Sequence, residues 1–348
     1  MWFSTFIPLI TIISGLSVLA NSSSECKNPE VRKEWRDMSD AQKKEFIRAV
    51  KCLGGKPHNS KLAPSGATSG IPPMNKRASY YDDFVYAHMD SNVKDHFTGL
   101  FLPWHRWYLH WLEKALKDEC GFQGTLPFWD WSRDTKNGIE ASPVFNSSKI
   151  YGLGTLGSNA TNYTVTDGAF GTVFRAYPTP HVVTRQYNAY PFKKQVFPFE
   201  FSKPDMPATD SFTPEALQKV VKGSRGNYTD FAYNIDGVRA QGMHNAAHLM
   251  MGGDLANPLV SPNDPMFYMH HANLDRIWAL WQNYNWQNKN AYGGGLTQNL
   301  PEYDTYPVGA PPAANKTCYL PTVGLSDPVQ VKDVMDMENG YLCYKYAY

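Results

Sequence analysis

Hydrophobic residues recur at helical spacing in five stretches of the chain, and segments rich in Gly, Pro, Ser and Asn separate these stretches. The first stretch begins with a capping box, in which the Ser39 hydroxyl and the Gln42 side chain satisfy backbone amides, and it ends at Gly54. The third stretch opens at Pro103, and proline is well suited to a first helical turn. In the fifth stretch Asp264 is the capping residue and Pro265 follows it. The predicted helices cover residues 40–53, 79–90, 103–120, 237–251 and 264–281.

The remaining segments predict loops rather than further helices. Residues 122–235 carry short aromatic and β-branched runs that Gly, Pro and Asn interrupt, so we expect long loops with minor strands there. Residues 55–76 and the tail from about residue 290 are expected to be coil. The pattern therefore predicts a mainly α fold, with a small helical bundle inside a shell of long loops and minor β-strands.

The first 20 residues differ from the rest of the chain. The run from Trp2 to Ala20 is apolar, is shorter than a comfortable bilayer span of about 20 residues, and ends in small residues that suit signal-peptidase cleavage. We expect residues 1–20 to be a signal peptide and residues 21–348 to form the mature domain, with an N-terminal membrane anchor as the alternative. Since no other stretch is apolar enough to span a membrane, we expect a secreted protein.

Glycosylation sequons agree with secretion. Glycans need exposed loops, and four of the six sequons fall between residues 146 and 227, so we expect this region to lie at the surface. The sequons are Asn21, Asn146, Asn159, Asn162, Asn227 and Asn315.

The five cysteines have no CxxC or other metal-type spacing, and an oxidising compartment favours disulfides. Spacing does not decide the pairing. We expect Cys26–Cys343, which would tie the two ends of the domain together, and Cys52–Cys120, with Cys318 unpaired.

The charge balance excludes two classes of partner. The 348 residues include 33 basic and 32 acidic side chains, and the formal net charge of +1 offers no electrostatic footprint for nucleic acid or an anionic membrane. With 42% hydrophobic and 14% aromatic residues, the chain is long and apolar enough to bury a sizeable core.

Histidines stand out among the candidate functional residues. His244 and His248 are four residues apart, so both imidazoles lie on one face of the predicted fourth helix, where they could chelate a metal. On the fifth helix the apolar stripe runs through His271, whereas His270 is rotated by about 100° from it. We therefore expect His271, rather than His270, to point inward.

Three more histidines precede these along the chain. His105 lies on the apolar stripe of the third helix, and the chain must bend at Gly99 and Pro103 for His96 to approach it from a loop. His88 lies on the preceding helix. The sequence thus offers two groups of three: His88, His96 and His105, and His244, His248 and His271.

The ligand type indicates the metal. Imidazoles without a thiolate or an obligatory carboxylate suit copper or zinc better than magnesium, calcium or manganese. Hydrolytic two-metal sites generally place Asp or Glu between their ions, and these histidines lack such neighbours in the right pattern. Two copper ions are therefore the expected cofactor, with dioxygen as a partner.

Two long motifs around these histidines resemble those of a known family. His96–Glu113, with the pattern HxxxxFLPWHRxxLxxxE, resembles the first copper motif of tyrosinases and catechol oxidases, and Asp264–Arg276, with the pattern DPMFYxxHxxxDR, resembles the second. The segment Leu126–Trp131 is similar to a core segment of that family. The similarity covers about residues 26–348 and is greatest to the short secreted fungal members.

The resemblance implies a type-3 dicopper centre inside a four-helix bundle. It implies that one copper is held by His88, His96 and His105, and the other by His244, His248 and His271. It also implies oxidation of o-diphenols to o-quinones by dioxygen, and some members of the family hydroxylate monophenols too.

Two departures from the family pattern concern the surroundings of the site. Many fungal relatives cross-link the second ligand to a Cys two residues earlier, and Lys94 stands at that position here. Many relatives carry a C-terminal domain that plugs the site, whereas this chain stops soon after Tyr341–Tyr344, which looks like the family's domain-ending motif. We expect no C-terminal plug domain. The segment Pro258–Val260 is expected to overhang the second copper.

A third feature concerns the proton acceptor. In tyrosinases proper, an Asn directly after the first ligand of the second copper helps an acidic residue hold a water that deprotonates monophenols, and Asn245 matches this Asn. The sequence leaves two candidates for the partner of Asn245, namely Gln241 and Asp236. We take Asn245 and Gln241 as the candidate catalytic residues. Because an amide does not accept a proton near neutral pH, Gln241 in that place predicts weak monophenol hydroxylation.

The leading hypothesis is a secreted type-3 copper oxidoreductase that oxidises small phenolic substrates. An alternative is a tailoring oxidase for one phenolic metabolite or a tyrosine-containing peptide, which would share the site and differ in pocket shape. An oxygen-binding protein like the related hemocyanins is a less favoured alternative, because such carriers shield the site with further domains.

Overall fold

The computed structural model describes Met1, residues 26–338 and residues 340–347, so the predicted signal peptide and the sequon at Asn21 lie outside the described residues. The α-helices are α1 (Asp40–Leu53), α2 (Tyr80–Asp95), α3 (Phe101–Cys120), α4 (Pro214–Lys222), α5 (Tyr228–Asp236), α6 (Met243–Met251), α7 (Met266–Tyr284) and α8 (Trp286–Lys289). The strands are β1 (Glu30–Arg32), β2 (Phe174–Arg175), β3 (His181–Val182), β4 (Gly295–Thr297), β5 (Ala310–Ala313) and β6 (Tyr344–Tyr346).

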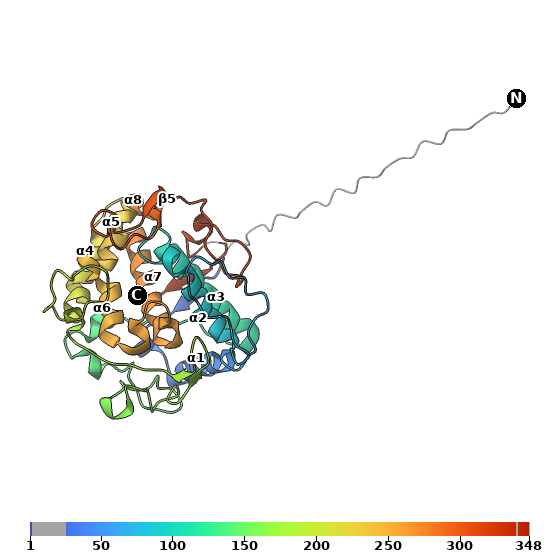
Figure 1. Ribbon diagram of the computed structural model, residues 1–348, viewed down its shortest axis with the longest axis vertical. Coiled ribbons are helices and arrows are strands. Elements are labelled where there is room, and N and C mark those ends of the chain that lie inside the picture. Colours follow the sequence, from blue (N-terminus) through green and yellow to red (C-terminus); the bar gives the residue numbers. More distant parts are fainter. Residues whose placement is uncertain (2–25, 339, 348) are drawn as a thin grey trace.

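The predicted mainly α architecture is confirmed. Helix α7 lies in the centre of the molecule, with α2 and α3 on one side and α6 on the other, and long loops surround them (Figure 1). Helix α3 packs against α1, α2 and α7. The strands form three separate two-stranded sheets, β1 with β6, β2 with β3, and β4 with β5. No helix of the described residues is long and apolar enough to cross a membrane.

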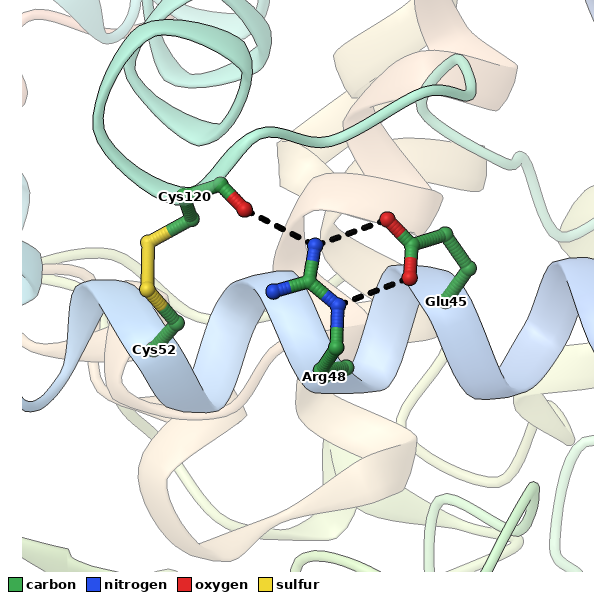
Figure 2. Close-up of a disulfide and its surroundings, with 4 residues drawn as sticks. All are labelled: Glu45, Arg48, Cys52 and Cys120. Atoms are coloured by element: carbon green, nitrogen blue, oxygen red, sulfur yellow. Dashed lines mark hydrogen bonds and ion pairs between the residues drawn. A yellow bond between two sulfur atoms is a disulfide. The ribbon is translucent and has the colours of Figure 1, made fainter.

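Helix α1 begins and ends where the sequence predicts. Ser39 accepts from the Gln42 amide, the Gln42 side chain accepts from the Ser39 amide, and Gly54 follows the last residue. The disulfide Cys52–Cys120 joins the end of α1 to the end of α3, and the Arg48 guanidinium next to it donates to the Cys120 carbonyl and to Glu45 (Figure 2). Both expected disulfides are present, and Cys318 is the remaining free cysteine.

Helix α2 is longer than predicted, since it runs to Asp95 instead of Asp90. Its last turn consists mostly of polar residues, so the hydrophobic pattern did not predict it. The side chains of Ser91, Asn92 and Asp95 in this turn are nevertheless buried and hydrogen-bonded. Ser91 donates to the Ala87 carbonyl (2.7 Å) and lies 2.7 Å from Asp95, while Asn92 donates to the Pro258 carbonyl (2.8 Å). Polar residues therefore extend this helix because partners within α2 and on the loop at Pro258 satisfy them.

The predicted bend between α2 and α3 is present, and α3 begins at Phe101 rather than Pro103. His96 follows α2 as its C-cap. A Cβ atom at Gly99 would lie 2.6 Å from the Gly293 carbonyl oxygen, so only glycine permits this close approach. Helix α3 ends at Gly121, whose positive φ of 61° suits the left-handed C-cap.

Two helices were missed in the region predicted to be loop. Helices α4 and α5 have nine residues each, and their signals are local, namely an N-cap at Thr213 followed by Pro214 and an N-cap at Asn227. The predicted fourth helix is also shorter than expected. It begins at Met243, because the chain folds back between Asp236 and Gly242.

A buried ionic network fastens the C-terminal segment to the bundle. Arg106 of α3 donates to Asp275 of α7 (2.5 Å) and to the carbonyls of Val334 (3.1 Å) and Met335 (3.0 Å). Asp275 also accepts from the hydroxyls of Tyr344 (2.5 Å) and Tyr346 (2.7 Å) of β6. The Cys26–Cys343 disulfide and the β1–β6 pairing add to this closure of the two ends of the described domain.

Candidate metal centre

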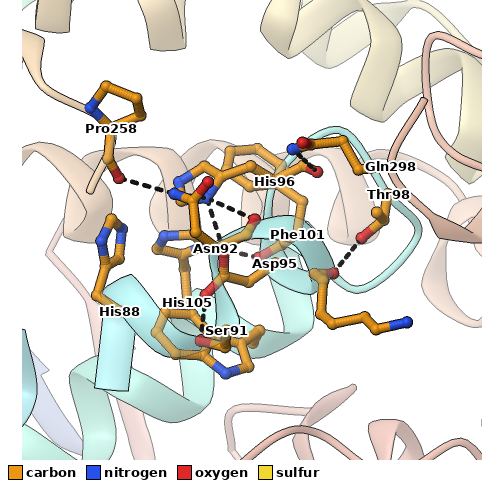
Figure 3. A network of polar contacts seen from close by, with 12 residues as sticks. His88, Ser91, Asn92, Asp95, His96, Thr98, Phe101, His105, Pro258 and Gln298 are labelled. Carbon is orange, nitrogen blue, oxygen red and sulfur yellow. Dashed lines mark hydrogen bonds and ion pairs between the residues drawn. The ribbon is translucent and has the colours of Figure 1, made fainter. Parts of the chain in front are cut away.

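Two groups of buried histidines converge between α2, α3, α6 and α7. His88, His96 and His105 form one group, whose ligand atoms all lie within 4.8 Å of one another (Figure 3). The second group contains His244 and His248 of α6 and His270 and His271 of α7. The groups face each other, since the rings of His105 and His271 stack with centroids 4.1 Å apart. All six expected ligands are thus brought together.

Backbone carbonyls orient the first group. His88 Nδ1 donates to the Leu259 carbonyl (3.1 Å), and His105 Nδ1 donates to the Phe101 carbonyl one turn earlier (2.9 Å). His96 Nδ1 lies 2.7 Å from an oxygen of Asp95. A carbonyl can only accept, so the Nε2 atoms of His88 and His105 keep a free lone pair, and both are buried without a protein partner.

Two imidazoles of the second group are oriented in the same way, whereas His271 Nδ1 is buried without a protein partner. His244 Nδ1 donates to Asp236 Oδ1 (2.7 Å), and His248 Nδ1 donates to the Leu255 carbonyl (2.7 Å). His244 Nε2 is buried without a protein partner, and the Nε2 atoms of His248 and His271 lie 3.2 Å apart. Such fixed Nδ1 partners are what metal-ligating imidazoles ordinarily have in proteins.

His270 differs from its neighbour His271 in its hydrogen bonding. The Trp131 indole donates to His270 Nδ1 (3.1 Å), and indole is a donor only. The proton of the neutral His270 ring must therefore sit on Nε2, so neither ring nitrogen of His270 has a free lone pair for a metal in this arrangement. Both His270 and His271 lie in the second group, and the choice of His271 rather than His270 as the ligand stays a prediction.

Burial favours the neutral form of five of the six imidazoles. It lowers the pKa of His88, His105, His244 and His271 well below the usual value, and that of His248 to about 4. Burial also lowers the pKa of His96, but the nearby Asp95 carboxylate more than offsets this, so the pKa of His96 is raised. Neutral imidazoles with unpaired nitrogens suit metal binding, because a ligand nitrogen must be deprotonated.

The residues present fit two copper ions. Each group offers three convergent nitrogens, compatible with an ion about 2 Å from each, and all-imidazole ligation suits copper. Carboxylates do not enter either group of ligand atoms among the described residues, although Asp95 and Asp236 stand directly behind His96 and His244.

The structure places Asp236, not Gln241, beside Asn245. Asn245 Nδ2 donates to Asp236 Oδ1 (3.0 Å), the same oxygen that accepts from His244. Gln241 turns the other way, since its side chain accepts from Ser202 (2.8 Å) and the Lys203 amide (2.8 Å) and donates to the Lys203 carbonyl (2.9 Å). Asp236 therefore replaces Gln241 as the candidate partner of Asn245. Burial raises the pKa of Asp236 to about 7.

A pocket of about 160 Å³ opens onto both groups of histidines. His96, His244, His248 and Asn245 form its polar side, and its walls include Phe97, Phe197, Leu255 and Pro258. Pro258, the first residue of the segment Pro258–Val260, lines the pocket, and the position of the segment over the second copper stays a prediction. Its bonds, however, reach the first group, through the Leu259 carbonyl to His88 and the Pro258 carbonyl to Asn92.

Several residues of the site carry no signal in the sequence. The backbone carbonyls of Leu255 and Leu259 accept hydrogen bonds from His248 and His88. Because a backbone carbonyl is present at every residue, the sequence gives no sign of this role. Asp95, next to His96, could have been found as a neighbouring carboxylate. Asp236 was visible as a candidate, but a continuous helix over 237–251 would have placed it out of reach.

The helical core and its two facing groups of imidazoles define the class of the protein, a type-3 dicopper oxidoreductase. A family model described as the common central domain of tyrosinase matches residues 78–284, which is more than half of the chain. The chain therefore belongs to the tyrosinase family and is a copper-dependent phenol oxidase.

Similar proteins support this assignment. The chain is 31% identical to the tyrosinase-like protein phomQ1 of Diaporthe leptostromiformis over 99% of this chain and 84% of that protein. It is 26% identical to the N-acetyl-6-hydroxytryptophan oxidase ivoB of Emericella nidulans, over 97% and 98% of the two chains. A polyphenol oxidase structure from Thermothelomyces thermophila shares the fold, with a TM-score of 0.70 and 24% identity over 92% of this chain and 89% of that one.

Proposed function

We propose that the protein oxidises o-diphenols to o-quinones with dioxygen, and that it also hydroxylates monophenols. The observation that carries the proposal is the convergence of six imidazoles in two facing groups of three, of which His96, His244 and His248 line one pocket. We assign one copper to His88, His96 and His105 and the other to His244, His248 and His271. Two bound copper ions would supply the redox chemistry with dioxygen.

The chain's own groups bind and orient the substrate. The pocket of about 160 Å³ is close to the cavity of about 150 Å³ that accommodates benzene in another protein, so it fits one aromatic ring. Phe97 and Phe197 give that ring apolar walls. The phenolic oxygens would then face the histidines, which are the polar side of the pocket.

Asp236 and Asn245 provide the means to deprotonate a monophenol. We propose that the Asp236 carboxylate and the Asn245 amide hold a water at the pocket, and that Asp236 accepts the proton which this water takes from the phenol. Asp236 is 3% exposed and its pKa is raised by burial to about 7, so it can accept a proton near neutral pH. With a carboxylate there, we propose stronger monophenol hydroxylation than Gln241 in that place would give.

A narrower substrate is the second candidate function. The relative ivoB is named for one hydroxylated, N-acetylated aromatic amino acid, which supports a tailoring oxidase with a specific phenolic substrate. Such an enzyme would use the same six histidines.

We also propose that the protein is secreted and N-glycosylated. Two disulfides favour an oxidising compartment. The side chains of Asn159, Asn162, Asn227 and Asn315 are exposed, and that of Asn146 is half-buried, so the described sequons are accessible to different degrees.

The test is quinone formation by the copper-loaded protein with matched 4-tert-butylcatechol and 4-tert-butylphenol. We expect turnover of both, and two copper ions per chain by metal analysis. His271→Ala should lose one copper and the activity, whereas His270→Ala should retain two copper ions. Reversible oxygen binding without quinone would contradict the proposal and support a carrier, and turnover of the catechol alone would remove the monophenol part.

A further inference from the structure

The pocket at the histidines continues into a larger groove on the protein surface. The groove has a volume of about 700 Å³, within the range of about 300–1,000 Å³ typical of sites for drug-sized ligands. Four residues line both the pocket and the groove, so the two spaces adjoin: Val196, Leu249, Ala256 and Pro258. A ligand with its ring in the pocket can therefore extend into the groove.

The groove has two walls that are tied to each other. One wall is the segment 186–198, and the other is the end of α6 with the loop 252–258. The Asn188 amide donates to the Met250 carbonyl (2.8 Å), which fixes the first wall to α6. At the base, a Cβ atom at Gly252 would lie 2.0 Å from the Gln186 carbonyl oxygen, so glycine lets the two backbones meet.

The groove is lined by polar and apolar residues alike and carries a single charge. Tyrosine, glutamine and asparagine side chains line it, and Lys194 is the one lining residue with a formal charge. Lys194 is exposed and no ion pair holds it within the described part of the chain, whereas its neighbour Lys193 pairs with Asp205 (3.2 Å). An unpaired ammonium group in a groove without carboxylates favours an anionic ligand.

We propose that the groove binds the acid-bearing tail of an extended phenolic substrate, and that Lys194 recognises the acid. The inference rests on the proposed function, since the phenol ring of this substrate would occupy the pocket at the histidines. A simple catechol fills only that pocket and leaves the groove empty. The substrate class is thus a phenol carried on a polar chain with a carboxylate, rather than a free catechol.

The test compares probes that differ only in the charge of the tail. The probes are N-acetyl-Dopa extended by zero to three glycines and ended by Glu amide, each matched by a Gln-ended form. The proteins are the copper-loaded wild type, Lys194→Gln and, as the matched control, Lys193→Gln. Initial rates of quinone formation give kcat/KM for each pair at low and high salt.

At low salt we expect the wild type to prefer the Glu-ended probe of the best length by about two- to fivefold, the range for an exposed ion pair. Lys194→Gln should bring this ratio to about one, Lys193→Gln should leave it unchanged, and salt should reduce it in the wild type. A ratio of one for the wild type at every length, or the same ratio in Lys194→Gln, would overturn the proposal.

The same design separates this inference from the proposed function and distinguishes two sources of the acid. Catechol turnover by the wild type reports on the proposed function alone, so its absence would be a different failure. Dihydroxyphenylalkanoic acids of matched length carry the acid without peptide bonds. If they show the same dependence on Lys194, a metabolite acid is sufficient, and if only the peptides do, the proposal holds for a peptide substrate.

Discussion

Replacing Asp236 with asparagine separates the two reactions that we propose for the site. Asp236 Oδ1 accepts from both His244 Nδ1 (2.7 Å) and Asn245 Nδ2 (3.0 Å). The side-chain carbonyl of an asparagine can accept the same two bonds, so the substitution removes the charge and the basicity while it preserves the shape of the site.

The expected magnitudes differ for the two substrates. A positioned general base contributes about 10²–10⁴-fold to rate, so kcat/KM for the monophenol should fall by that factor, or by about 3–5 kcal/mol of barrier. For the diphenol, the substitution only replaces a charged hydrogen-bond acceptor of His244 with a neutral one, which weakens that hydrogen bond by about 1 kcal/mol. The kcat/KM for the diphenol should therefore fall by about fivefold. The monophenol-to-diphenol ratio should therefore fall by at least about twentyfold.

The assay measures quinone absorbance and oxygen consumption with 4-tert-butylphenol and 4-tert-butylcatechol, and the copper content of each variant. Gln241→Ala is the control, because the bonds of Gln241 go to Ser202 and Lys203, and it should leave the ratio unchanged. Equal losses for both substrates in Asp236→Asn would refute the reasoning, since they would show that Asp236 acts only through His244. A lower ratio in Gln241→Ala would refute the assignment of the base.

Three further predictions concern stability. Asp275→Asn breaks the buried pair with Arg106 and leaves the Tyr344 and Tyr346 hydroxyls facing an amide, so it should lower the free energy of unfolding in urea by about 3–5 kcal/mol. The control Asp118→Asn, at the exposed pair with Lys114, should lower it by at most about 1 kcal/mol. Equal losses for the two variants would contradict the role of the network. Burial raises the pKa of Asp83 from 3.8 to about 7, so the native state holds this proton more tightly than the unfolded state and stability should fall as the pH rises from about 4 to about 7. Asp83→Asn should flatten that fall, and an unchanged difference between pH 4 and pH 7 would count against the shift. The double variant Cys52→Ala, Cys120→Ala opens a disulfide between residues 68 positions apart, and chain entropy predicts a loss of about 4 kcal/mol in the same unfolding experiment; a loss below about 1 kcal/mol would contradict this reading.

The sequence predicted five helices from their hydrophobic repeats, and local capping signals placed some of their ends. The capping box of Ser39 and Gln42 placed the start of α1 correctly, because both partners lie within one turn. The spacing of His244 and His248 fixed two imidazoles on one face of α6, and the stripe argument chose His271 over His270. The hydrogen bond from Trp131 to His270 supports that choice with a contact that spans 139 positions of the chain.

The local pattern failed where tertiary partners decide. The last turn of α2 is polar, and it is helical because Ser91 and Asn92 find acceptors on α2 itself and on the loop at Pro258. Helices α4 and α5 are short, and packing rather than a long hydrophobic repeat stabilises them.

The candidate proton acceptor shows the limit of the local pattern most directly. On an unbroken helix, Gln241 would share a face with Asn245, and Asp236 would be more than two turns away. The chain instead folds back at Gly237, with positive φ angles at Arg239 and Ala240, and the Gly242 amide donates to the Asp236 carbonyl (2.5 Å). This reversal brings Asp236 to Asn245. The sequence by itself indicated the family, five of the helices and the two groups of three histidines. Only the tertiary structure places Asp236, the carbonyls of Leu255 and Leu259 and the groove beside them, because those contacts join residues that no local pattern relates.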